Sequence, residues 1–338
     1  MKKVKRFLTI VGLCFLLSCV FINAAPDRCE LEAEKEVLVY YLESPSDVET
    51  YPILLAIEGS YVAKRGPSTV LRLHELLSSE ILSWGAALMT LERRGVDGKD
   101  IDKDTYHYYN VPSQRLADHL QLVQHIRENP PLGWNGQLII FGYSEGSLIA
   151  ISLARRTHPS ACVAIAGCGD QRFKKYIWKL IQSMRSSMPW WKRFIISWWA
   201  SIPKDRAAYN ARCDMMKRDP DHKKWWFGAT FRYWADALDR CEADDFLTLP
   251  CPCLVVAGSE DVECESTDRI VQMAKDNGKD VTYMRVEGMG HGALDPQWKV
   301  LDGVRKFLQD KHLKVKCYFT CSISLGRQDL SKNDSSGL

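Results

Sequence analysis

One stretch decides the fold of this chain: Leu138-Ile139-Ile140-Phe141-Gly142-Tyr143-Ser144-Glu145-Gly146-Ser147-Leu148-Ile149-Ala150. Apolar residues lead up to Gly142, and an apolar run that suits a helix follows Gly146. This order predicts a strand, a sharp turn and a helix, with Ser144 at the apex of the turn. Such a turn strains the serine backbone and lifts its hydroxyl off the sheet edge, and flanking glycines avoid a clash there. We interpret Ser144 as a nucleophile, and the alternative is a glycine turn with a purely structural role.

A serine hydroxyl is a weak nucleophile, so it needs a base, and the base needs an orienting acid. After a turn of this kind the acid and then the histidine are expected further along the chain. Asp261 follows the apolar run 254–257 and is the predicted acid, with Glu260 and Glu263 as alternatives. His291 lies between two glycines after the last expected strand and is the predicted base. Other histidines fall on expected helices or at their ends and are interpreted as packing or surface residues: His74, His119, His125 and His158.

The negative charge that develops on an attacked carbonyl oxygen needs backbone N–H donors, the oxyanion hole. The helix that begins after Ser144 points its amides at this place. One donor is therefore expected at Glu145, directly after the nucleophile. The second is expected at Ser60, in the loop Glu58-Gly59-Ser60 that follows a buried strand. Removing one such donor typically lowers the rate by ~10²–10³.

Apolar segments with strand character alternate with helical segments along most of the chain. The expected strands are residues 37–41, 53–57, 86–91, 138–141, 162–166, 254–257 and 282–286, and the expected helices include residues 115–128 and 298–311. Alternation of this kind is typical of a mostly parallel sheet with helices on both faces. The expected fold class is therefore α/β.

Residues 170–246 break this alternation and are rich in lysine and arginine. They hold eight of the eleven tryptophans: Trp178, Trp190, Trp191, Trp198, Trp199, Trp225, Trp226 and Trp234. We expect an α/β core at 26–169 and 247–312, a helical lid inserted at 170–246, and a flexible polar tail at 313–338. The tryptophans either form the lid's own core, or line an apolar substrate entrance or touch a membrane surface. These interpretations do not exclude one another.

Residues 1–25 have the order of a secretory signal, in which a short basic segment precedes an apolar run. The run Leu16-Leu17-Ser18-Cys19 partly matches a bacterial lipobox, which predicts a lipidated Cys19 as the new N-terminus. Cleavage after Ala24 or Ala25 and an uncleaved membrane anchor are the alternatives. The expected location is therefore periplasmic or membrane-anchored, as a lipoprotein, or alternatively secreted.

The formal net charge of +3 becomes −1 without residues 1–25, which carry four basic residues and no acidic one. A nearly neutral chain gives no reason to expect nucleic acid as a partner. No Cys/His cluster has the spacing of a zinc site, so we expect no metal and no cofactor. Cys162, Cys251 and Cys253 lie in or beside expected core strands, where cysteine packs as a small apolar residue. Export permits disulfides, for which the better candidates are Cys29, Cys213, Cys241, Cys264, Cys317 and Cys321.

Together these motifs resemble those of the α/β-hydrolase-fold serine hydrolases. The matching runs are Gly142-Tyr143-Ser144-Glu145-Gly146, Gly258-Ser259-Glu260-Asp261 and Gly290-His291-Gly292, which stand in the family's order. Two further runs look like a bacterial branch of esterase- or peptidase-like members: Glu58-Gly59-Ser60 and Glu92-Arg93-Arg94-Gly95-Val96. Many family members carry His-Gly where this chain has Glu58-Gly59, and a backbone donor at Ser60 survives that change. The resemblance covers about residues 37–311, implies hydrolysis, and does not settle the substrate.

The sequence thus predicts an exported serine esterase of lipase type. Ser144 would attack an ester carbonyl, His291 would pass the proton to the leaving alcohol, and Asp261 would fix the imidazole tautomer. The Trp-rich lid favours an apolar acyl chain, so the expected partners are small-molecule or lipid esters and a membrane surface. The alternatives are a peptidase or thioesterase on the same fold and a non-catalytic envelope lipoprotein. The complete Ser-Asp-His set argues against the last of these.

Overall fold

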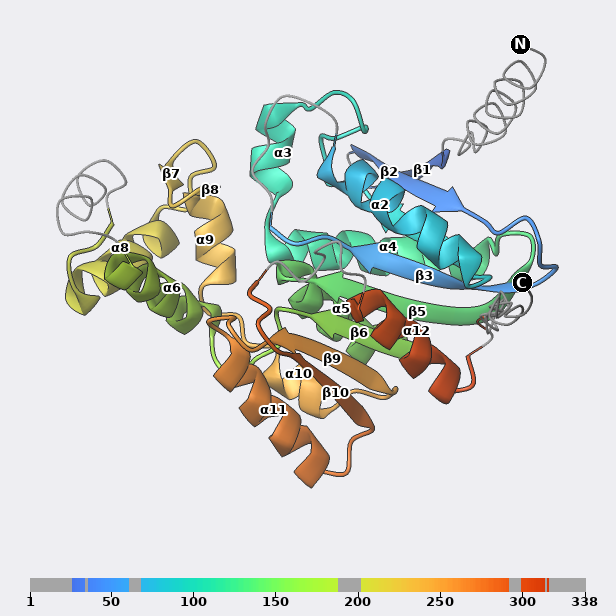
Figure 1. Cartoon of the computed structure of the whole chain (residues 1–338). Coiled ribbons are helices and arrows are strands. Elements are labelled where there is room, and N and C mark those ends of the chain that lie inside the picture. The colour runs from blue at the N-terminus through green and yellow to red at the C-terminus, as the bar shows by residue number, and fades with distance from the viewer. Residues whose placement is uncertain are drawn as a thin grey trace, which may run out of the picture.

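The computed structural model describes residues 26–33, 36–60, 68–187, 202–291, 299–313 and 315 (Figure 1). The expectations for residues 1–25, including a lipidated Cys19, and for nearly all of the tail lie outside these residues. In the part of the chain that is described, no helix has the length and apolar character needed to cross a membrane.

A single eight-stranded sheet organises the described chain. Its strands are β1 (Asp27–Ala33), β2 (Glu36–Glu43), β3 (Tyr51–Ile57), β4 (Ala87–Leu91), β5 (Trp134–Tyr143), β6 (Ala161–Ile165), β9 (Cys253–Gly258) and β10 (Val281–Val286). Their spatial order is β1-β2-β4-β3-β5-β6-β9-β10. The β1–β2 and β2–β4 pairs are antiparallel, and every other neighbouring pair is parallel. The predicted mostly parallel sheet is confirmed, with β1 as an edge strand that was not expected.

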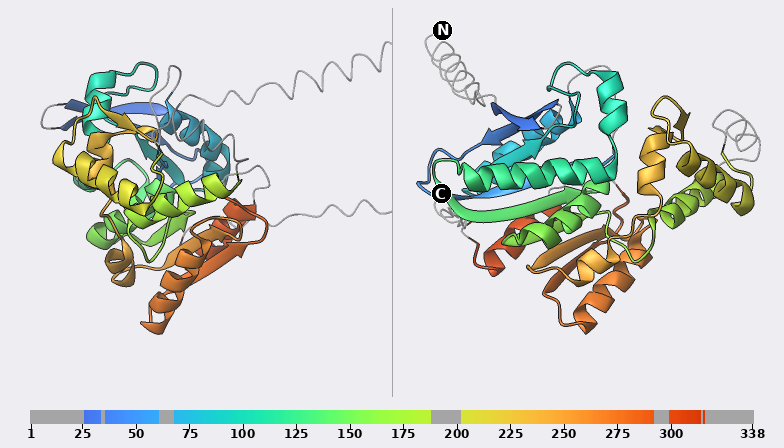
Figure 2. Two further views of the ribbon diagram at one scale, coloured as in Figure 1. Left: turned by 90° about the vertical axis from the view of Figure 1, so that its left-hand side faces the viewer. Right: turned by 180° about the vertical axis from the view of Figure 1, so that it is seen from behind.

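The central strands are apolar along their whole length because both faces of the sheet are covered. Every residue of β3, β4, β6 and β9 is buried. One face packs against α2 (Thr69–Ser83) and α12 (Lys299–Asp310), whose apolar side chains join one continuous core cluster. The other face packs against α4 (Pro112–Glu128), α5 (Glu145–Thr157), α10 (Ala243–Leu247) and α11 (Cys264–Asp276). Figure 2 (right) shows α4 and α5 lying across this second face. The predicted helices on both faces are confirmed.

Between β6 and β9 the chain leaves the sheet and builds a separate group of elements. These are α6 (Phe173–Ser187), α8 (Arg206–Arg218), the antiparallel pair β7 (Trp225–Trp226) and β8 (Ala229–Thr230), and α9 (Phe231–Ala237). They stand at the left-hand end of the sheet in Figure 1. They share an apolar core of their own, which includes Tyr209, Met216, Trp226 and Trp234. This group of elements is called the insertion below.

Polar contacts fasten α9 to the body of the protein. The Asp236 carboxylate accepts hydrogen bonds from the backbone and the hydroxyl of Ser113, at the start of α4. The Arg232 guanidinium donates to the carbonyl of Tyr108, in α3 (Lys103–Tyr109), at 2.7 Å. Just before α6, Asp170 forms an ion pair with Arg269 of α11 at 2.7 Å. Polar contacts therefore hold the chain to the core at α9 and immediately before the insertion.

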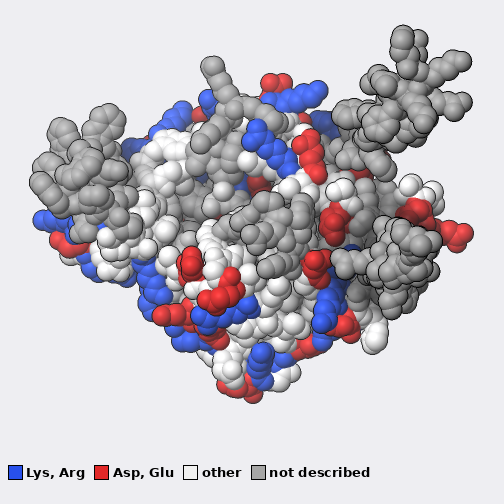
Figure 3. Space-filling model, in the orientation of Figure 1, with Lys and Arg blue, Asp and Glu red and all other residues white. Residues whose placement is uncertain are grey.

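The cysteines that the structure describes are free thiols. Of the disulfide candidates, Cys213 and Cys264 are buried, Cys29 is half-buried and Cys241 is exposed, whereas Cys317 and Cys321 lie outside the described residues. Acidic and basic side chains are interspersed over the face shown in Figure 3. This mixture agrees with the nearly neutral charge of the chain after residue 25.

Candidate active site

Ser144 lies at the tip of a strained turn between β5 and α5. Its φ and ψ are 54° and −123°, a conformation that L-residues with a side chain rarely adopt. The Ser144 N–H donates to the carbonyl of Ile165 at 2.8 Å, which fixes the turn to the end of β6. A Cβ on Gly146 would lie only 2.2 Å from the carbonyl oxygen of Ile57, so no other residue fits there without movement. The turn therefore has the geometry expected of a nucleophile-bearing elbow.

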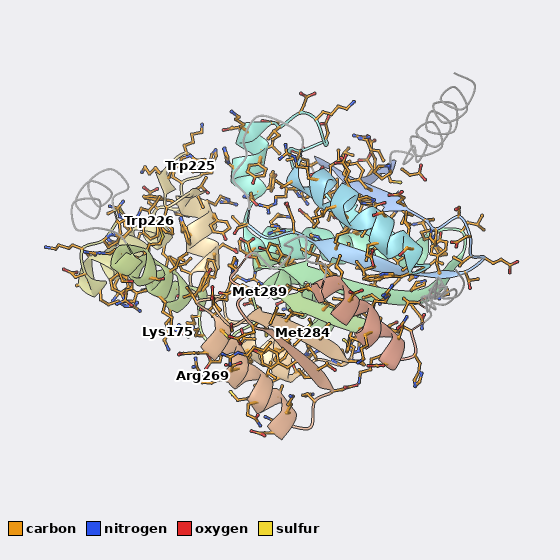
Figure 4. All side chains as sticks on the ribbon, in the orientation of Figure 1. Lys175, Trp225, Trp226, Arg269, Met284 and Met289 are labelled. Atoms are coloured by element: carbon orange, nitrogen blue, oxygen red, sulfur yellow. The ribbon has the colours of Figure 1, made fainter. Side chains whose placement is uncertain are left out.

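Three predicted side chains meet at the carboxyl ends of β5, β9 and β10. The Ser144 Oγ lies 2.9 Å from Nε2 of His291, and Nδ1 of His291 lies 2.9 Å from Oδ2 of Asp261. The Asp261 side chain is 3% exposed, whereas that of His291 is 43% exposed. The hydrogen bond from Asp261 raises the pKa of His291 above its ordinary value. In Figure 4 the labelled Met289 marks the loop after β10 that carries this histidine.

The two alternative acids do not contact the histidine. Glu260 is exposed, and its backbone N–H donates to the carbonyl of Met289. The Glu263 carboxylate accepts a hydrogen bond from the Gln171 amide at 3.0 Å, and burial raises its pKa. The Glu263 backbone N–H in turn donates to Oδ1 of Asp261 at 3.0 Å, which helps to hold that carboxylate in place. Asp261 is therefore the acid that the geometry favours.

The histidines that the sequence placed on helices or at their ends are packing or surface residues in the structure. His74 is buried in α2 and contacts the Thr90 hydroxyl at 2.9 Å, and burial lowers its pKa to about 4. His119 is buried in α4, where burial lowers its pKa to about 3. His158 takes the left-handed conformation that ends α5. His125 also lies in α4, with its ring edge against Tyr40. None of these four lines the cavity described below.

The expected oxyanion loop lies against the nucleophile. A Cβ on Gly59 would be 2.9 Å from Cβ of Ser144, so the loop backbone and the serine are in close contact. Ser60 and Glu145 line the same cavity as Ser144 and His291. The positions predicted to supply the two backbone donors are thus brought together at the serine.

This cavity has a volume of about 260 Å³ and lies between the sheet edge and the insertion. Its apolar wall comes from α5, α6, the β7–β8 pair and α9: Leu148, Phe173, Tyr176, Ile177, Leu180, Trp225, Phe227 and Trp234. Its polar wall includes Glu242 and Glu263, and burial raises the pKa of both carboxyl groups. Glu242 forms an ion pair with Arg240 at 2.8 Å. A molecule held beside Ser144 would therefore contact mostly apolar side chains.

The described tryptophans of the insertion differ in burial. Trp226 and Trp234 are 3% and 4% exposed and belong to the insertion's own core, against which Trp178 packs, and Trp234 also lines the cavity. Trp225 is 44% exposed, lines the cavity and packs edge-on against His107 with ring centroids 4.7 Å apart. Figure 4 shows Trp225 and Trp226 labelled one after the other in the insertion. The paired tryptophans 190, 191, 198 and 199 lie outside the described residues.

The sequence did not predict that four charged side chains pair and are buried beneath the cavity. Glu58 pairs with Arg93 at 2.7 Å, and Arg115 pairs with Glu145 at 2.5 Å. Glu58, Arg93 and Glu145 stood in runs that the sequence singled out, but nothing marked Arg115, because a charged residue in a helix ordinarily faces water. Tyr233 of α9 joins this group by donating its hydroxyl to Glu145.

Within the described residues, no group of three or more His, Cys, Asp or Glu side chains is arranged to hold a metal ion. The groups that meet beside the cavity are the Ser144 hydroxyl, the His291 imidazole, the Asp261 carboxylate and backbone amides. This set is suited to nucleophilic attack on an acyl carbon followed by hydrolysis.

Comparisons with known proteins identify the family and the fold of this chain. The family model described as serine aminopeptidase, S33 matches residues 68–296, which is more than half of the chain. A search of the curated proteins finds no match. Among solved structures, a proline iminopeptidase from Mycobacterium smegmatis superposes with a TM-score of 0.58 at 13% identity, over 85% of this chain and 99% of that one.

Two esterase-type structures are similar to the same extent. An esterase from Pyrococcus furiosus has a TM-score of 0.56 at 13% identity, over 85% of this chain and 91% of that one. Est1E from Butyrivibrio proteoclasticus has a TM-score of 0.51 at 14% identity, over 84% of this chain and 98% of that one. At these identities the likeness shows the fold alone, which esterases and peptidases share.

Proposed function

The chain belongs to the serine aminopeptidase S33 family of α/β-hydrolase-fold serine hydrolases, and on this premise we propose that it hydrolyses carboxylic esters with an apolar acyl group. One observation carries the proposal: the hydrogen-bonded series Ser144–His291–Asp261 opens onto a cavity with a largely apolar wall. A cavity of about 260 Å³ beside the serine is suited to a medium-sized acyl group.

In the proposed reaction, Oγ of Ser144 attacks the ester carbonyl while Nε2 of His291 takes its proton. The new negative charge on the carbonyl oxygen is stabilised by the backbone N–H groups of Ser60 and Glu145. His291 then gives the proton to the leaving alcohol, and an acyl-enzyme remains. Water, activated by the same histidine, releases the acid and restores the serine. Asp261 keeps Nδ1 protonated and stabilises the imidazolium that forms in each step.

Covalent labelling tests the nucleophile. A fluorophosphonate probe should modify the wild-type protein and leave Ser144→Ala unmodified, because the probe reports an activated serine. Hydrolysis of p-nitrophenyl esters from acetate to palmitate then tests the acyl preference, with peptide p-nitroanilides and acyl thioesters as controls. Labelling together with an optimum at medium or long chains supports the proposal. A protein that is neither labelled nor active on any substrate would instead be a binding protein with this fold.

A peptidase reaction is the second candidate, and one observation favours it. The carboxyl groups of Glu242 and Glu263 lie on the cavity wall, where a carboxylate would attract a substrate's amino group. Against it, Glu242 is already paired with Arg240, and burial raises the pKa of Glu263, which disfavours its charged form. Faster turnover of aminoacyl p-nitroanilides than of any p-nitrophenyl ester would select this candidate.

We also propose that the protein is exported, because residues 1–25 have the order of a secretory signal. Fractionation of cells that express the tagged full chain and a chain without residues 1–25 tests this proposal. Palmitate labelling that is lost in Cys19→Ala would identify a lipoprotein, and recovery of both chains in the cytoplasm would contradict export.

A further inference from the structure

Four charged side chains are buried directly behind the cavity, and they alternate in sign. Arg93 and Glu58 are 5% and 10% exposed, and Arg115 and Glu145 are 4% and 3% exposed. Burying charges is costly unless each is paired and hydrogen-bonded. Burial opposes ionisation of Glu145, yet Arg115 and Arg93 hold its pKa below the ordinary value. The geometry therefore shows two buried ion pairs, Arg93–Glu58 and Arg115–Glu145, side by side.

Arg93 holds the peptide that carries the first oxyanion donor. Its Nε donates to Oε1 of Glu58 at 2.7 Å, and its Nη2 donates to the carbonyl oxygen of Gly59. In a trans peptide the carbonyl and the following N–H point in opposite directions. Because Arg93 fixes the Gly59 carbonyl, the Ser60 N–H must point away from the guanidinium. The orientation of the Ser60 donor is therefore set by Arg93.

Arg115 connects the two loops that carry the donors. Its Nη2 donates to the Glu58 carbonyl at 2.9 Å, and its Nη1 donates to the Glu145 carboxylate at 2.5 Å. Glu58 begins the loop with Ser60, whereas Glu145 itself carries the second donor. One rigid, planar guanidinium thus fixes the separation of the two donors.

The insertion also reaches this group of charges. Tyr233 of α9 is 5% exposed, lines the cavity and donates its hydroxyl to the second oxygen of Glu145. Both Glu145 oxygens are thereby occupied, one from α4 and one from α9. This hydrogen bond joins α9, which lines the cavity, to α5, whose first residue Glu145 carries the second N–H donor.

We propose that Arg93 and Arg115 are positioning residues, which hold the backbone N–H groups of Ser60 and Glu145 in the geometry that the oxyanion requires, and that Tyr233 reinforces this arrangement from the insertion. The inference rests on the proposed hydrolytic function of the cavity. It also explains the departure at position 58, because the Glu58 carboxylate is the partner that keeps Arg93 beside the Gly59 carbonyl.

Arg93→Lys tests the proposal with the charge kept. A lysine ammonium does not span both the Glu58 carboxylate and the Gly59 carbonyl as the guanidinium fork does. We expect kcat to fall by ~10²-fold, as for loss of an oxyanion donor, with little change in KM. The affinity for a trifluoromethyl ketone, whose adduct with Ser144 carries an oxyanion, should fall by a similar factor. A residue with a merely structural role would leave that affinity unchanged in the folded protein.

Arg94→Lys is the matched control. Arg94 is the next residue, is also buried, and binds Asp118 of α4 through two nitrogens at 3.0 and 2.7 Å. This pair does not touch the oxyanion loop or line the cavity. We expect Arg94→Lys to lower the melting temperature about as much as Arg93→Lys while kcat and the ketone affinity stay near wild type. Equal losses of kcat and ketone affinity in both variants would overturn the proposal.

Tyr233→Phe keeps the test decisive if an arginine variant does not fold, because it removes one hydroxyl and leaves the aromatic ring in place. It should lower kcat and the ketone affinity together by several-fold. The control is Tyr209→Phe, which removes the hydroxyl that donates to the Lys174 carbonyl within the insertion. Unchanged kcat and ketone affinity in Tyr233→Phe and Arg93→Lys overturn the inference while wild-type activity stands. Absence of wild-type labelling and hydrolysis is instead a failure of the proposed function.

Discussion

Gly59→Ala places one methyl group between the oxyanion loop and the nucleophile. The new Cβ would lie 2.9 Å from Cβ of Ser144 and 3.3 Å from the carbonyl oxygen of Tyr143. Ordinary contacts of a Cβ begin at 3.4 Å, so the loop and the serine must separate by about 0.5 Å. The backbone of Gly59 is not in the left-handed region, so the substitution adds volume without adding backbone strain.

The neighbours of this contact have little freedom to move. The loop is held from behind by Arg93, and Ser144 is held by its N–H bond to Ile165. The displacement should therefore appear in the distance between the serine and the oxyanion donors. A misplacement of 1 Å costs ~10²-fold in rate, so about 0.5 Å should cost roughly 10-fold or more in kcat. Overpacking should lower the free energy of unfolding by ~1–3 kcal/mol.

The assay is kcat and KM on p-nitrophenyl butyrate, measured beside urea unfolding. The control is Gly136→Ala, at the far end of β5 from Ser144, where φ is +84° and no described atom lies within 4 Å of the new Cβ. That variant should lose ~1–2 kcal/mol of stability through backbone strain alone and keep its kcat. A kcat for Gly59→Ala within twofold of wild type would refute the close contact. Equal losses of kcat in both variants would mean that the rate depends on the stability of the fold and not on the distance between Ser144 and the oxyanion donors.

Three further predictions concern the catalytic acid, the tryptophans of the insertion and the buried side chain of Glu92, which accepts hydrogen bonds from Tyr41 and Ser68. Asp261→Asn should lower kcat by ~10⁴-fold because the histidine loses its oriented tautomer. Glu263→Gln should keep most ester hydrolysis. The reverse order of activities would assign the role of the acid to Glu263. Trp225→Ala should lower the turnover of long-chain esters more than that of acetate esters, at an unchanged melting temperature. Trp226→Ala should mainly lower the melting temperature. Equal effects of the two variants in both assays would show that Trp225 does not contact the acyl group. Burial raises the pKa of Glu92 to about 7 from 4.5, so the stability it contributes is full below pH 4.5 and is lost as the pH rises through 7. Relative to wild type, Glu92→Gln should therefore gain up to about 3 kcal/mol between pH 4.5 and pH 8.5 in urea unfolding, and an equal difference at both pH values would contradict this.

The parts of the site that the sequence predicted depend on local patterns. Ser144 follows from a strand, a glycine turn and a helix that are adjacent in the chain, and His291 and Asp261 follow from short loops after apolar strands. Parallel strands bring their carboxyl ends to one edge, so three distant loops meet there without any further information. The sheet was predicted for the same reason, because fully apolar runs identify strands that are covered on both faces.

The parts that were missed depend on partners far apart in the chain. Arg93 lies 35 residues from Glu58, and Arg115 lies 30 residues from Glu145. Hydrophobic periodicity places charged residues in water, and nothing local marks a pair of charges as buried. The tryptophans show the same limit, because Trp225 and Trp226 are neighbours in the chain and point to different environments. The sequence showed how many tryptophans the insertion holds, but it did not show which of them line the cavity.

The buried charge group also constrains how this site can change in evolution. Replacing Glu58 by a neutral histidine would leave the Arg93 charge buried without its partner, and replacing Arg93 alone would strand Glu58 in the same way. A lineage can change the Glu-Gly loop of this chain into the His-Gly loop of many family members only by replacing both Glu58 and Arg93. The intermediate with one replacement carries an unpaired buried charge. We therefore expect positions 58 and 93 to vary together among relatives.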